Sequence, residues 1–451
     1  MAIIATEIPS KEARGRTNVS VSNNSDVGHT EGRSRCISAL FRGEESRDGL
    51  HAEIQTCLFK PSSHAVCLPI HSHTNIYPII NTYSLIARPT IPIPPSTHLL
   101  RTAMASPALP KTMRAIHQPD RASSKLRMAE TPVPTPTDPD DVLVKVAATS
   151  PCRGELWWAR DFPSLFPADK EPVPGQDLAG TVVAAPSGSQ FKPGDEVFAR
   201  IHATRPGAAR EYALALQTEL ALKPKRLGWV DAAAVPLSAL TAWQAVFTHG
   251  TLEPAAVFGD EDAKARNAKK RVLVTAASGG VGGFAVQFAA AAGAAAVVAV
   301  NSGAKAQLVR ELGATEVVDY KKQAVDAWAS EDPASRVVDL IVDCIGGPTM
   351  GHLWAAIKEG GTFISVCNHP DAVKPADTTK SLAKAHFFIV EPLGSQLGEI
   401  SKLIDAGSFR PLVDSVFEFM QFQEAFDKAD GNASGKVVLK VSVSVEESFS
   451  A

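Results

Sequence analysis

A strand, a glycine-rich turn and a helix follow one another between residues 271 and 292. Residues 272–274 are an apolar run typical of a buried strand, and the Ala-rich segment 284–292 is typical of a helix. Between them, residues 276–282 form an Ala-x-x-Gly-x-x-Gly pattern. Small residues let the backbone approach a pyrophosphate, and the helix N-terminus supplies free N–H groups and a positive dipole end. The segment therefore predicts a dinucleotide-binding turn.

The residues after this turn bear on which dinucleotide is bound. A second apolar strand is expected at residues 296–300. An NAD-preferring site usually places a carboxylate about twenty residues past the glycines, for the ribose 2′-hydroxyl. Ser302 and Lys305 stand there instead, and a hydroxyl with a cation suits a 2′-phosphate. Tyr320 ends the next short strand, where it is expected to flank the adenosine. We predict NADPH as the cofactor; the alternative is that Lys305 is a solvated lysine at a helix start.

Charge and cysteine usage restrict the partners and the compartment. The 45 Lys and Arg residues nearly balance the 48 Asp and Glu residues, which gives no indication of a nucleic acid or anionic membrane as partner. No window reaches the roughly 18 apolar residues of a membrane span. The six cysteines are scattered without a C-x-x-C pair, as is typical of free thiols in a reducing compartment. We expect a cytoplasmic enzyme that acts on a small-molecule substrate.

The composition and periodicity of the chain change near residue 112. Residues 1–112 lack sustained periodicity, are rich in Ser, Thr, Asn, His and Pro, and have no acidic residue between Glu53 and Asp120. This composition predicts a disordered leader. Because residues 104–113 resemble an ordinary cytosolic start, the leader is either an upstream gene-model extension or a targeting or regulatory tail.

Two periodicities divide the rest of the chain. Residues 113–236 contain many short strand-like segments separated by Pro/Gly turns, which predicts a β-rich domain or barrel. Residues 237–386 alternate strands with helices, which predicts a doubly wound parallel sheet. The tail, residues 387–445, returns to short strands and is expected to complete the β-rich domain. The sequence thus predicts an α/β protein with two folded domains.

Several motifs resemble, in their order, the medium-chain dehydrogenase/reductase superfamily, and within it the zinc-independent quinone oxidoreductases of the zeta-crystallin type. The likeness covers residues 113–441, and residues 154–158 further resemble fungal members. The motifs are Val-Pro-Gly-x-Asp-x-Ala-Gly at 173–180, Lys-Pro-Gly-Asp-Glu-Val at 192–197, Leu-Thr-Ala-Trp at 240–243, the glycine turn at 276–282, Leu-Gly-Ala at 312–314 and Gly-Lys-Val-Val-Leu at 435–439. The resemblance implies a GroES-like catalytic domain and a Rossmann-type domain for NADPH; relatives often form homodimers.

The resemblance also bears on zinc. Zinc-using relatives hold the metal through a Cys after the first long strand, a His in a Gly-His-Glu element and a third Cys or acid. Cys152 occupies the first position, but Gln176 and Asp177 stand where His-Glu is expected, and residues 236–238 replace the third ligand. Since a catalytic zinc takes three protein ligands, we predict no metal site. Cys152 is then either a pocket-lining thiol or a nucleophile activated by Arg153.

The resemblance implies a pocket between the two domains. Its candidate walls are Cys152, Glu155, Trp157 and Trp158. The sequence contains no assured general acid for the reaction. Glu155 and Tyr212 are candidates, and water can supply the final proton instead. The two tryptophans either stack on a flat acceptor or pack in the core. The candidate cofactor-binding residues are Thr241, Ala277, Ser278, Gly279, Gly280, Val281, Gly282, Ser302, Lys305, Tyr320, Ile345, Gly346, Phe388, Val390 and Lys436.

Three functions remain open at this stage. The leading one is a zinc-free, NADPH-dependent oxidoreductase that transfers hydride to quinones or α,β-unsaturated carbonyl compounds. The second is an enoyl-thioester reductase of fatty acid or polyketide synthesis. The third, from another class, is a non-catalytic NADPH-binding interaction protein.

Overall fold

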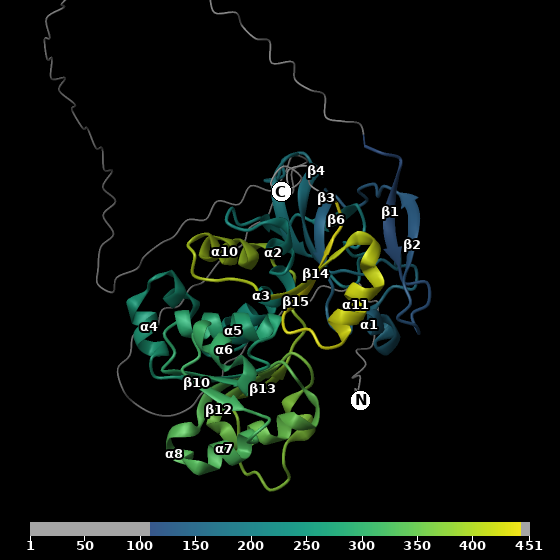
Figure 1. The fold of residues 1–451 in the computed structure, drawn as a ribbon. Coiled ribbons are helices and arrows are strands. Elements are labelled where there is room, and N and C mark those ends of the chain that lie inside the picture. Colours follow the sequence, from purple (N-terminus) through teal and green to yellow (C-terminus); the bar gives the residue numbers. More distant parts are fainter. Residues whose placement is uncertain (1–108, 443–451) are drawn as a thin grey trace, which may run out of the picture. The chain divides into compact units, whose positions relative to one another are not determined.

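The computed structural model describes residues 109–442. The predicted leader, up to residue 108, and the alternative start at Met104 lie outside the described residues. Figure 1 shows a β-rich part and a parallel sheet covered by helices, in agreement with the predicted α/β class of GroES-like and Rossmann-type domains. Within residues 109–442, no helix is both long and apolar enough to span a bilayer.

Seven strands form the larger β-rich sheet, in the order β14-β15-β3-β4-β5-β7 with β6 paired to β3, and β1 pairs with β2. Strand β15 comes from the end of the chain and pairs antiparallel with β3, so that distant segments share one sheet. The bounds are β1 Thr112–His117, β2 Arg127–Pro132, β3 Asp141–Ser150, β4 Asp177–Ala184, β5 Glu196–Arg200, β6 Tyr212–Leu216, β7 Leu220–Leu222, β14 Val413–Glu418 and β15 Lys436–Lys440.

The six strands of the second sheet are all parallel, in the order β10-β9-β8-β11-β12-β13. Their order reverses between β8 and β11, and ligands of open α/β sheets bind at the carboxyl ends of the strands at such a reversal. The bounds are β8 Arg271–Thr275, β9 Ala296–Asn301, β10 Glu316–Asp319, β11 Val338–Asp343, β12 Ile357–Ser365 and β13 Lys384–Phe387.

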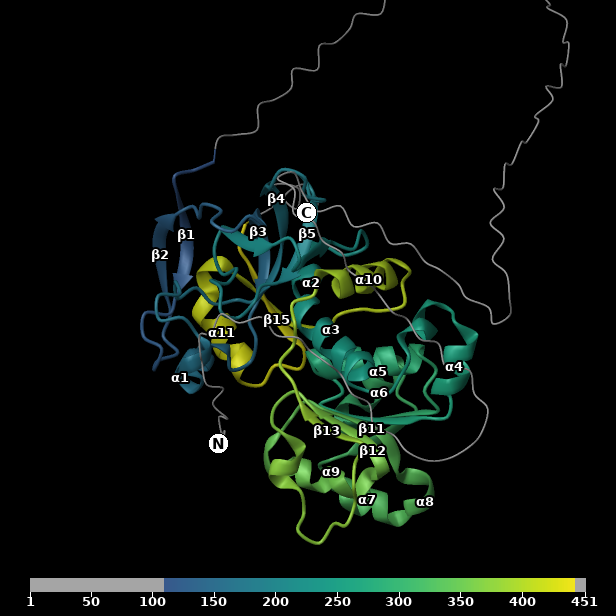
Figure 2. The ribbon, with the colours of Figure 1, turned by 180° about the vertical axis from the view of Figure 1, so that it is seen from behind.

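Helices cover both faces of the parallel sheet, with α5 and α6 on one face and α7, α8 and α9 on the other (Figures 1 and 2). The helices are α1 Glu155–Asp161, α2 Trp229–Ala233, α3 Pro236–Trp243, α4 Glu261–Asn267, α5 Gly280–Ala291, α6 Ala306–Glu311, α7 Val325–Glu331, α8 Pro333–Arg336, α9 Leu353–Ala356, α10 Gly394–Asp405 and α11 Phe422–Asp430. Residues Gln244–Thr248 continue α3 as a π-helical turn. Short 3₁₀ segments lie at Pro163–Leu165, Pro254–Phe258, Gly303–Lys305, Gly347–His352, Pro370–Val373 and Phe419–Gln421.

Alternation of side chains along the strands explains the separate cores. In β8, Val272 and Val274 pack with Phe284 of α5, whereas Leu273 packs on the opposite face with Trp354 of α9. All of these side chains are buried, because a parallel sheet with helices on both faces excludes water from both. A third cluster fills the interior of the β-rich part.

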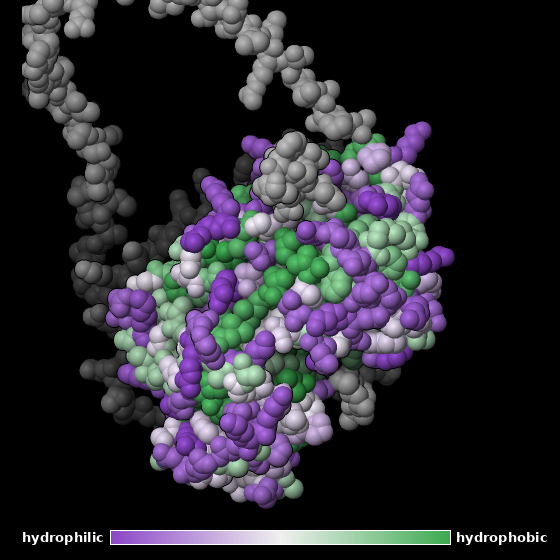
Figure 3. Space-filling view, viewed as in Figure 1, coloured by the Kyte–Doolittle hydropathy of each residue, from purple (hydrophilic) through white to green (hydrophobic). Residues whose placement is uncertain are grey.

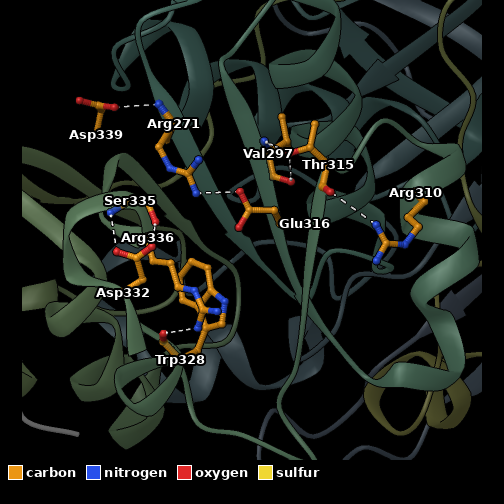
Figure 4. Close-up of polar contacts among 10 residues, drawn as sticks. All are labelled: Arg271, Val297, Arg310, Thr315, Glu316, Trp328, Asp332, Ser335, Arg336 and Asp339. Atoms are coloured by element: carbon orange, nitrogen blue, oxygen red, sulfur yellow. Dashed lines mark hydrogen bonds and ion pairs between the residues drawn. The ribbon is translucent and has the colours of Figure 1, made fainter. Parts of the chain in front are cut away.

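Ion pairs join the strands at the amino-terminal edge of the parallel sheet. The guanidinium of Arg271 lies 2.8 Å from Glu316 Oε1. The backbone N–H of Arg271 donates to Asp339 Oδ2 (2.7 Å), as Figure 4 shows. These contacts connect β8 with β10 and β11. Nearby, the Arg336 guanidinium donates to the Trp328 carbonyl oxygen (2.7 Å) and lies over the indole ring. Charged side chains therefore hold the edge of the sheet opposite the one at which a nucleotide is expected.

Candidate active site

The glycine turn lies between β8 and α5, and its backbone is packed too tightly for side chains. A Cβ at Gly282 would lie 2.2 Å from the Ala276 carbonyl oxygen, and one at Gly280 would lie 2.6 Å from Ser238 Oγ. Ala276 itself has a φ of 46°, which is uncommon for a residue with a Cβ. Helix α5 begins at Gly280, so the predicted residues 277–282 form the turn and the first residues of the helix. This arrangement fits the pyrophosphate of a dinucleotide, because N–H groups at the helix N-terminus remain free for it.

Polar side chains at the end of β9 lie next to this turn. Ser278 donates from Oγ to Asn301 Oδ1 (2.8 Å), and both residues are buried. Ser302 precedes the 3₁₀ turn Gly303–Lys305, and no described residue accepts a hydrogen bond from the Lys305 ammonium or pairs with it. Tyr320 is 58% exposed just beyond β10. The described contacts thus leave Lys305 and Tyr320 available to a ligand.

The structure adds a carboxylate at this edge that the sequence interpretation did not consider. Asp319 is the last residue of β10 and lies opposite Asn301 in the strand register. A Cβ at Gly303 would lie 2.4 Å from Asp319 Oδ2, so this carboxylate packs against the turn between Ser302 and Lys305. Its other oxygen accepts the Lys321 backbone N–H (3.1 Å). Strand pairing brings Asp319 there, and spacing along the chain gave no signal of it.

Asp343 at the end of β11 is a second residue that sequence reasoning missed. Its fully buried carboxylate accepts hydrogen bonds from the hydroxyls of Thr275 (2.8 Å) and Ser365 (2.9 Å). It also accepts the backbone N–H groups of Ile345 (3.2 Å) and Gly346 (2.9 Å). These bonds hold the carboxyl ends of β8, β11 and β12 together and fix the loop that contains the two predicted residues. Ile345 is left 52% exposed, as a free apolar side chain beside this edge.

A buried ion pair within the β-rich sheet is hydrogen-bonded to the start of α3. Asp177 Oδ2 lies 2.9 Å from Lys436 Nζ, and Asp177 Oδ1 accepts the Leu237 backbone N–H (2.6 Å). Burial raises the pKa of Asp177 even though Lys436 opposes that rise. Lys436 also donates to the Pro151 carbonyl oxygen (3.0 Å). Its ammonium, predicted as a cofactor ligand, is therefore already paired. Its alkyl stem lies against the glycine turn, 3.2 Å from where a Gly280 Cβ would be.

Glu155 and Cys152 lie beside this pair. The Glu155 carboxylate accepts the backbone N–H groups of Cys152 (2.9 Å) and Gly175 (2.8 Å), so it anchors the loop after β3 to the loop before β4. Burial raises the pKa of Glu155 to about 7. Burial likewise raises the pKa of the Cys152 thiol to about 12. A thiol with this pKa stays protonated at neutral pH, which favours the interpretation of Cys152 as a pocket-lining group over a nucleophile.

The two tryptophans of α1 differ in their surroundings. Trp157 donates from its indole N–H to Asp430 Oδ2 (3.1 Å), and the Arg160 guanidinium lies 4.3 Å from its ring centre. Trp158 instead lines a pocket together with Glu155 and Phe166. One face of the Trp157 ring is thus covered, and Trp158 is the better placed of the two to contact a flat ligand.

Other predicted residues are partly or wholly engaged. Thr241 donates its hydroxyl proton to the Leu237 carbonyl oxygen (2.6 Å) within α3. Phe388 is buried in the core and packs on His249 with ring centres 4.4 Å apart, and Val390 packs against the same core. Tyr212 pairs with Lys145 of β3, five residues before Ser150, which places it about 16 Å along the strand from the Cys152 loop. Tyr212 is therefore a poor candidate for the proton donor.

The residues around Cys152 do not fit a catalytic zinc. Asp177 pairs with the Lys436 ammonium, and Gln176 has an amide where zinc-using relatives have a ligating imidazole. Among residues 109–442, no cluster of three or more His, Cys, Asp or Glu side chains is arranged to hold a metal ion.

Comparison with known proteins adds evidence on family and location. Residues 138–226 match the alcohol dehydrogenase GroES-like domain, and residues 312–439 match the zinc-binding dehydrogenase family. A probable zinc-binding oxidoreductase, mitochondrial, from Arthroderma benhamiae is 44% identical over 74% of this chain and 98% of the relative. The NAD(P)H oxidoreductase RTN4IP1, mitochondrial, of Danio rerio is 35% identical over 59% of this chain and 71% of the relative. A chloroplast envelope quinone oxidoreductase homolog of Arabidopsis thaliana is 32% identical over 70% of this chain and 94% of the relative.

These comparisons overturn one expectation from the sequence. We expected a cytoplasmic protein because the cysteines are scattered without a C-x-x-C pair, as in free thiols of a reducing compartment. That expectation is wrong, since the fungal and the zebrafish relatives are both mitochondrial by name. Free thiols indicate a reducing compartment but do not distinguish the cytosol from the inside of an organelle.

Proposed function

Because the chain belongs to the medium-chain dehydrogenase/reductase superfamily, among its quinone-oxidoreductase-like members, and is an NAD(P)H oxidoreductase, we propose a specific reaction for it. It uses NADPH, requires no zinc, and reduces quinones or α,β-unsaturated carbonyl compounds. The observation that carries the proposal is the contrast between the two sides of the site. A tightly packed glycine turn that suits a dinucleotide lies on one side, while on the other Asp177 is paired with Lys436.

The choice of NADPH is supported by the end of β9. No acid ends β9: its last residue is Asn301, whose side chain is bonded to Ser278. The Ser302 hydroxyl and the unpaired Lys305 ammonium would hold a 2′-phosphate, because a cation strengthens hydrogen bonds to phosphate oxygens. Asp319 opposes this preference through its own charge, so the balance between Asp319 and Lys305 sets the selectivity.

The choice of acceptor is supported by the absence of a suitable metal-ligand set in the described site and by apolar surface. The reduced nicotinamide supplies hydride, and conjugated carbonyl compounds accept hydride without a metal when hydrogen bonds stabilise the charge that forms on oxygen. Figure 3 shows hydrophobic surface in a band across the middle of one face, with hydrophilic surface on both sides. Trp158 and Ile345 add apolar area for a planar acceptor.

An acceptor panel tests the proposal. Purified protein would be given NADPH with 9,10-phenanthrenequinone, 2-cyclohexen-1-one, trans-2-hexenal or crotonyl-CoA, and oxidation followed at 340 nm before and after treatment with a chelator. We expect turnover with the quinone or the enones, unchanged by the chelator, and far less than one zinc per chain by elemental analysis. Turnover with crotonyl-CoA alone would favour the enoyl-thioester reductase, saturable NADPH binding without turnover would favour a binding protein, and chelator-sensitive turnover would refute the zinc-free mechanism.

We further propose that the protein acts in mitochondria, as the named relatives do. The full chain with a C-terminal fluorescent tag should colocalise with a mitochondrial marker in fungal cells. A uniform cytosolic signal would contradict this.

A further inference from the structure

Arg200 ends β5 on the side of the sheet that faces α3. In the register of β4 and β5, Arg200 lies opposite Asp177, and Phe198 lies opposite Ala179. Because side chains alternate along a strand, these four share one face. Phe198 and Ala179 belong to the core that contains Leu240 of α3. Arg200 therefore points to the side on which Asp177 contacts the start of α3, next to the glycine turn.

The Arg200 guanidinium is buried without a hydrogen-bond partner. The residue is 2% exposed, and its Nε and Nη1 atoms are buried with no acceptor. No hydrogen bond or ion pair joins this guanidinium to any residue in the described range 109–442. The other buried arginine of the described residues, Arg210, leaves its Nε without a partner but pairs through Nη1 with Glu171 Oε2 (2.8 Å). An unpaired buried guanidinium is costly, which makes Arg200 a candidate to bind an acceptor group of a ligand.

The three carboxylates that interact with Arg200 electrostatically are already occupied by other donors. Asp177 accepts from Leu237 and pairs with Lys436. Glu219 accepts the backbone N–H groups of His202 (3.0 Å) and Leu216 (3.0 Å). Glu155 accepts those of Cys152 and Gly175.

The chemistry of the guanidinium indicates what kind of group completes this site. Its buried N–H groups are charged donors, so they suit an acceptor oxygen that is neutral when it enters the site and gains negative charge during the reaction. A carbonyl oxygen meets both conditions.

We propose that Arg200 donates its free N–H groups to the carbonyl oxygen of the acceptor and stabilises the negative charge that develops there. This inference rests on the proposed function. In an enone, hydride adds to the β-carbon, and the π electrons of the alkene form a new double bond between the α-carbon and the carbonyl carbon. The carbonyl π pair moves to oxygen, beside Arg200. A proton from water then adds to the α-carbon and the carbonyl re-forms, so the acceptor gains two hydrogens and NADPH becomes NADP⁺.

Such a contact strengthens during the reaction, because the oxygen carries more charge in the transition state than in the bound substrate. Loss of Arg200 should therefore lower kcat more than it raises KM. In enzymes, removal of one donor to a developing oxyanion typically lowers kcat by about 10²–10³.

The test compares Arg200→Met and Arg200→Lys with the wild type and with Arg127→Met, a control at an exposed position in β2. The measurements are kcat and KM for 2-cyclohexen-1-one, the Kd for NADPH, the Tm, and inhibition by cyclohexanone, which has the carbonyl but no double bond. For Arg200→Met we expect kcat to fall about 100-fold, with NADPH affinity unchanged and cyclohexanone inhibition weakened. The Tm should stay equal or rise, because an unpaired buried charge has been removed.

Two further measurements test the inference if Arg200→Met does not fold: the kcat of Arg200→Lys, and the rescue of Arg200→Ala by added guanidinium. Lysine retains the charge but loses the planar fork, so we expect a smaller loss of kcat, of about tenfold. Added guanidinium at millimolar concentration should restore part of the rate of Arg200→Ala. A kcat within threefold of wild type in both folded variants would overturn the inference while leaving the proposed function intact. A large fall in Tm together with weaker NADPH binding would show a structural role and overturn it as well. A wild-type enzyme inactive with every acceptor would refute the proposed function itself.

Discussion

Two effects act in opposite directions on the pKa of Glu155. Its carboxylate accepts two backbone N–H groups, which favour the ionised form, and it is buried, which favours the protonated form. Burial has the larger effect and raises its pKa from 4.5 to about 7. Between these two values, the folded protein binds a proton at Glu155 that the unfolded chain has released. Low pH therefore favours the folded state through this residue, and the stabilisation is lost as the pH rises through 7.

This pH dependence can be measured with Glu155→Gln. We predict that the free energy of unfolding of the wild type falls by about 2–3 kcal/mol more than that of the variant between pH 5 and pH 7.5. Urea denaturation at the two pH values measures the difference. Glu424→Gln, at an exposed position of α11, should follow the wild type. A variant with the same pH dependence as the wild type would show that Glu155 is ionised across this range.

Some residues of the candidate site could be predicted from the sequence, and others could not. Lys305, Ser302 and Tyr320 were recognisable because they follow a strand at a known spacing from the glycines. Asp319 and Arg200 had no such signal, because strand pairing, and not distance along the chain, brings them to the site. Whether a recognised residue still has free donors, as Lys305 does and Lys436 does not, depends on contacts that the sequence alone does not reveal.

At the scale of elements, the turn between β8 and α5 is the most constrained segment. We predict that Gly282→Ala prevents NADPH binding, because the added Cβ would lie 2.2 Å from the Ala276 carbonyl oxygen and would force α5 away from the turn. Fluorescence titration with NADPH measures binding, and circular dichroism checks the fold. Gly398→Ala in α10 is the matched control, since its Cβ would meet nothing within 4 Å. The control should bind normally and gain up to about 1 kcal/mol in stability. Normal binding by Gly282→Ala would contradict this account of the turn.

Strands with a clear period or a full apolar run were predictable, and those with neither were not. The apolar runs of β8 and β9 identified those strands. Strand β2 was missed because no residue in Arg127–Pro132 is fully buried. Helix α5 begins at Gly280, four residues before the predicted 284, because its glycines weaken helix propensity but pack tightly here.

At the scale of the molecule, the site depends on segments distant in the chain. Asp177 comes from β4, Lys436 from β15 and the Leu237 N–H group from α3, and their contacts join the β-rich sheet to the nucleotide side. The two-sheet organisation followed from the change in periodicity near residue 236 and from the order of the motifs. The compartment did not, because cysteine content does not encode an organelle.

Calorimetric titration of NADPH and NADH tests the central claim that this is an NADPH enzyme whose 2′-phosphate is recognised at the end of β9. The proteins are the wild type, Lys305→Ala and the control Lys269→Ala, whose exposed lysine precedes β8 at the opposite edge of the sheet. We predict that the wild type binds NADPH more tightly than NADH. Lys305→Ala should lose about 1–3 kcal/mol of binding free energy for NADPH and almost none for NADH, and the control should behave as the wild type. Tighter binding of NADH by the wild type, or equal losses for both nucleotides in Lys305→Ala, would contradict the claim.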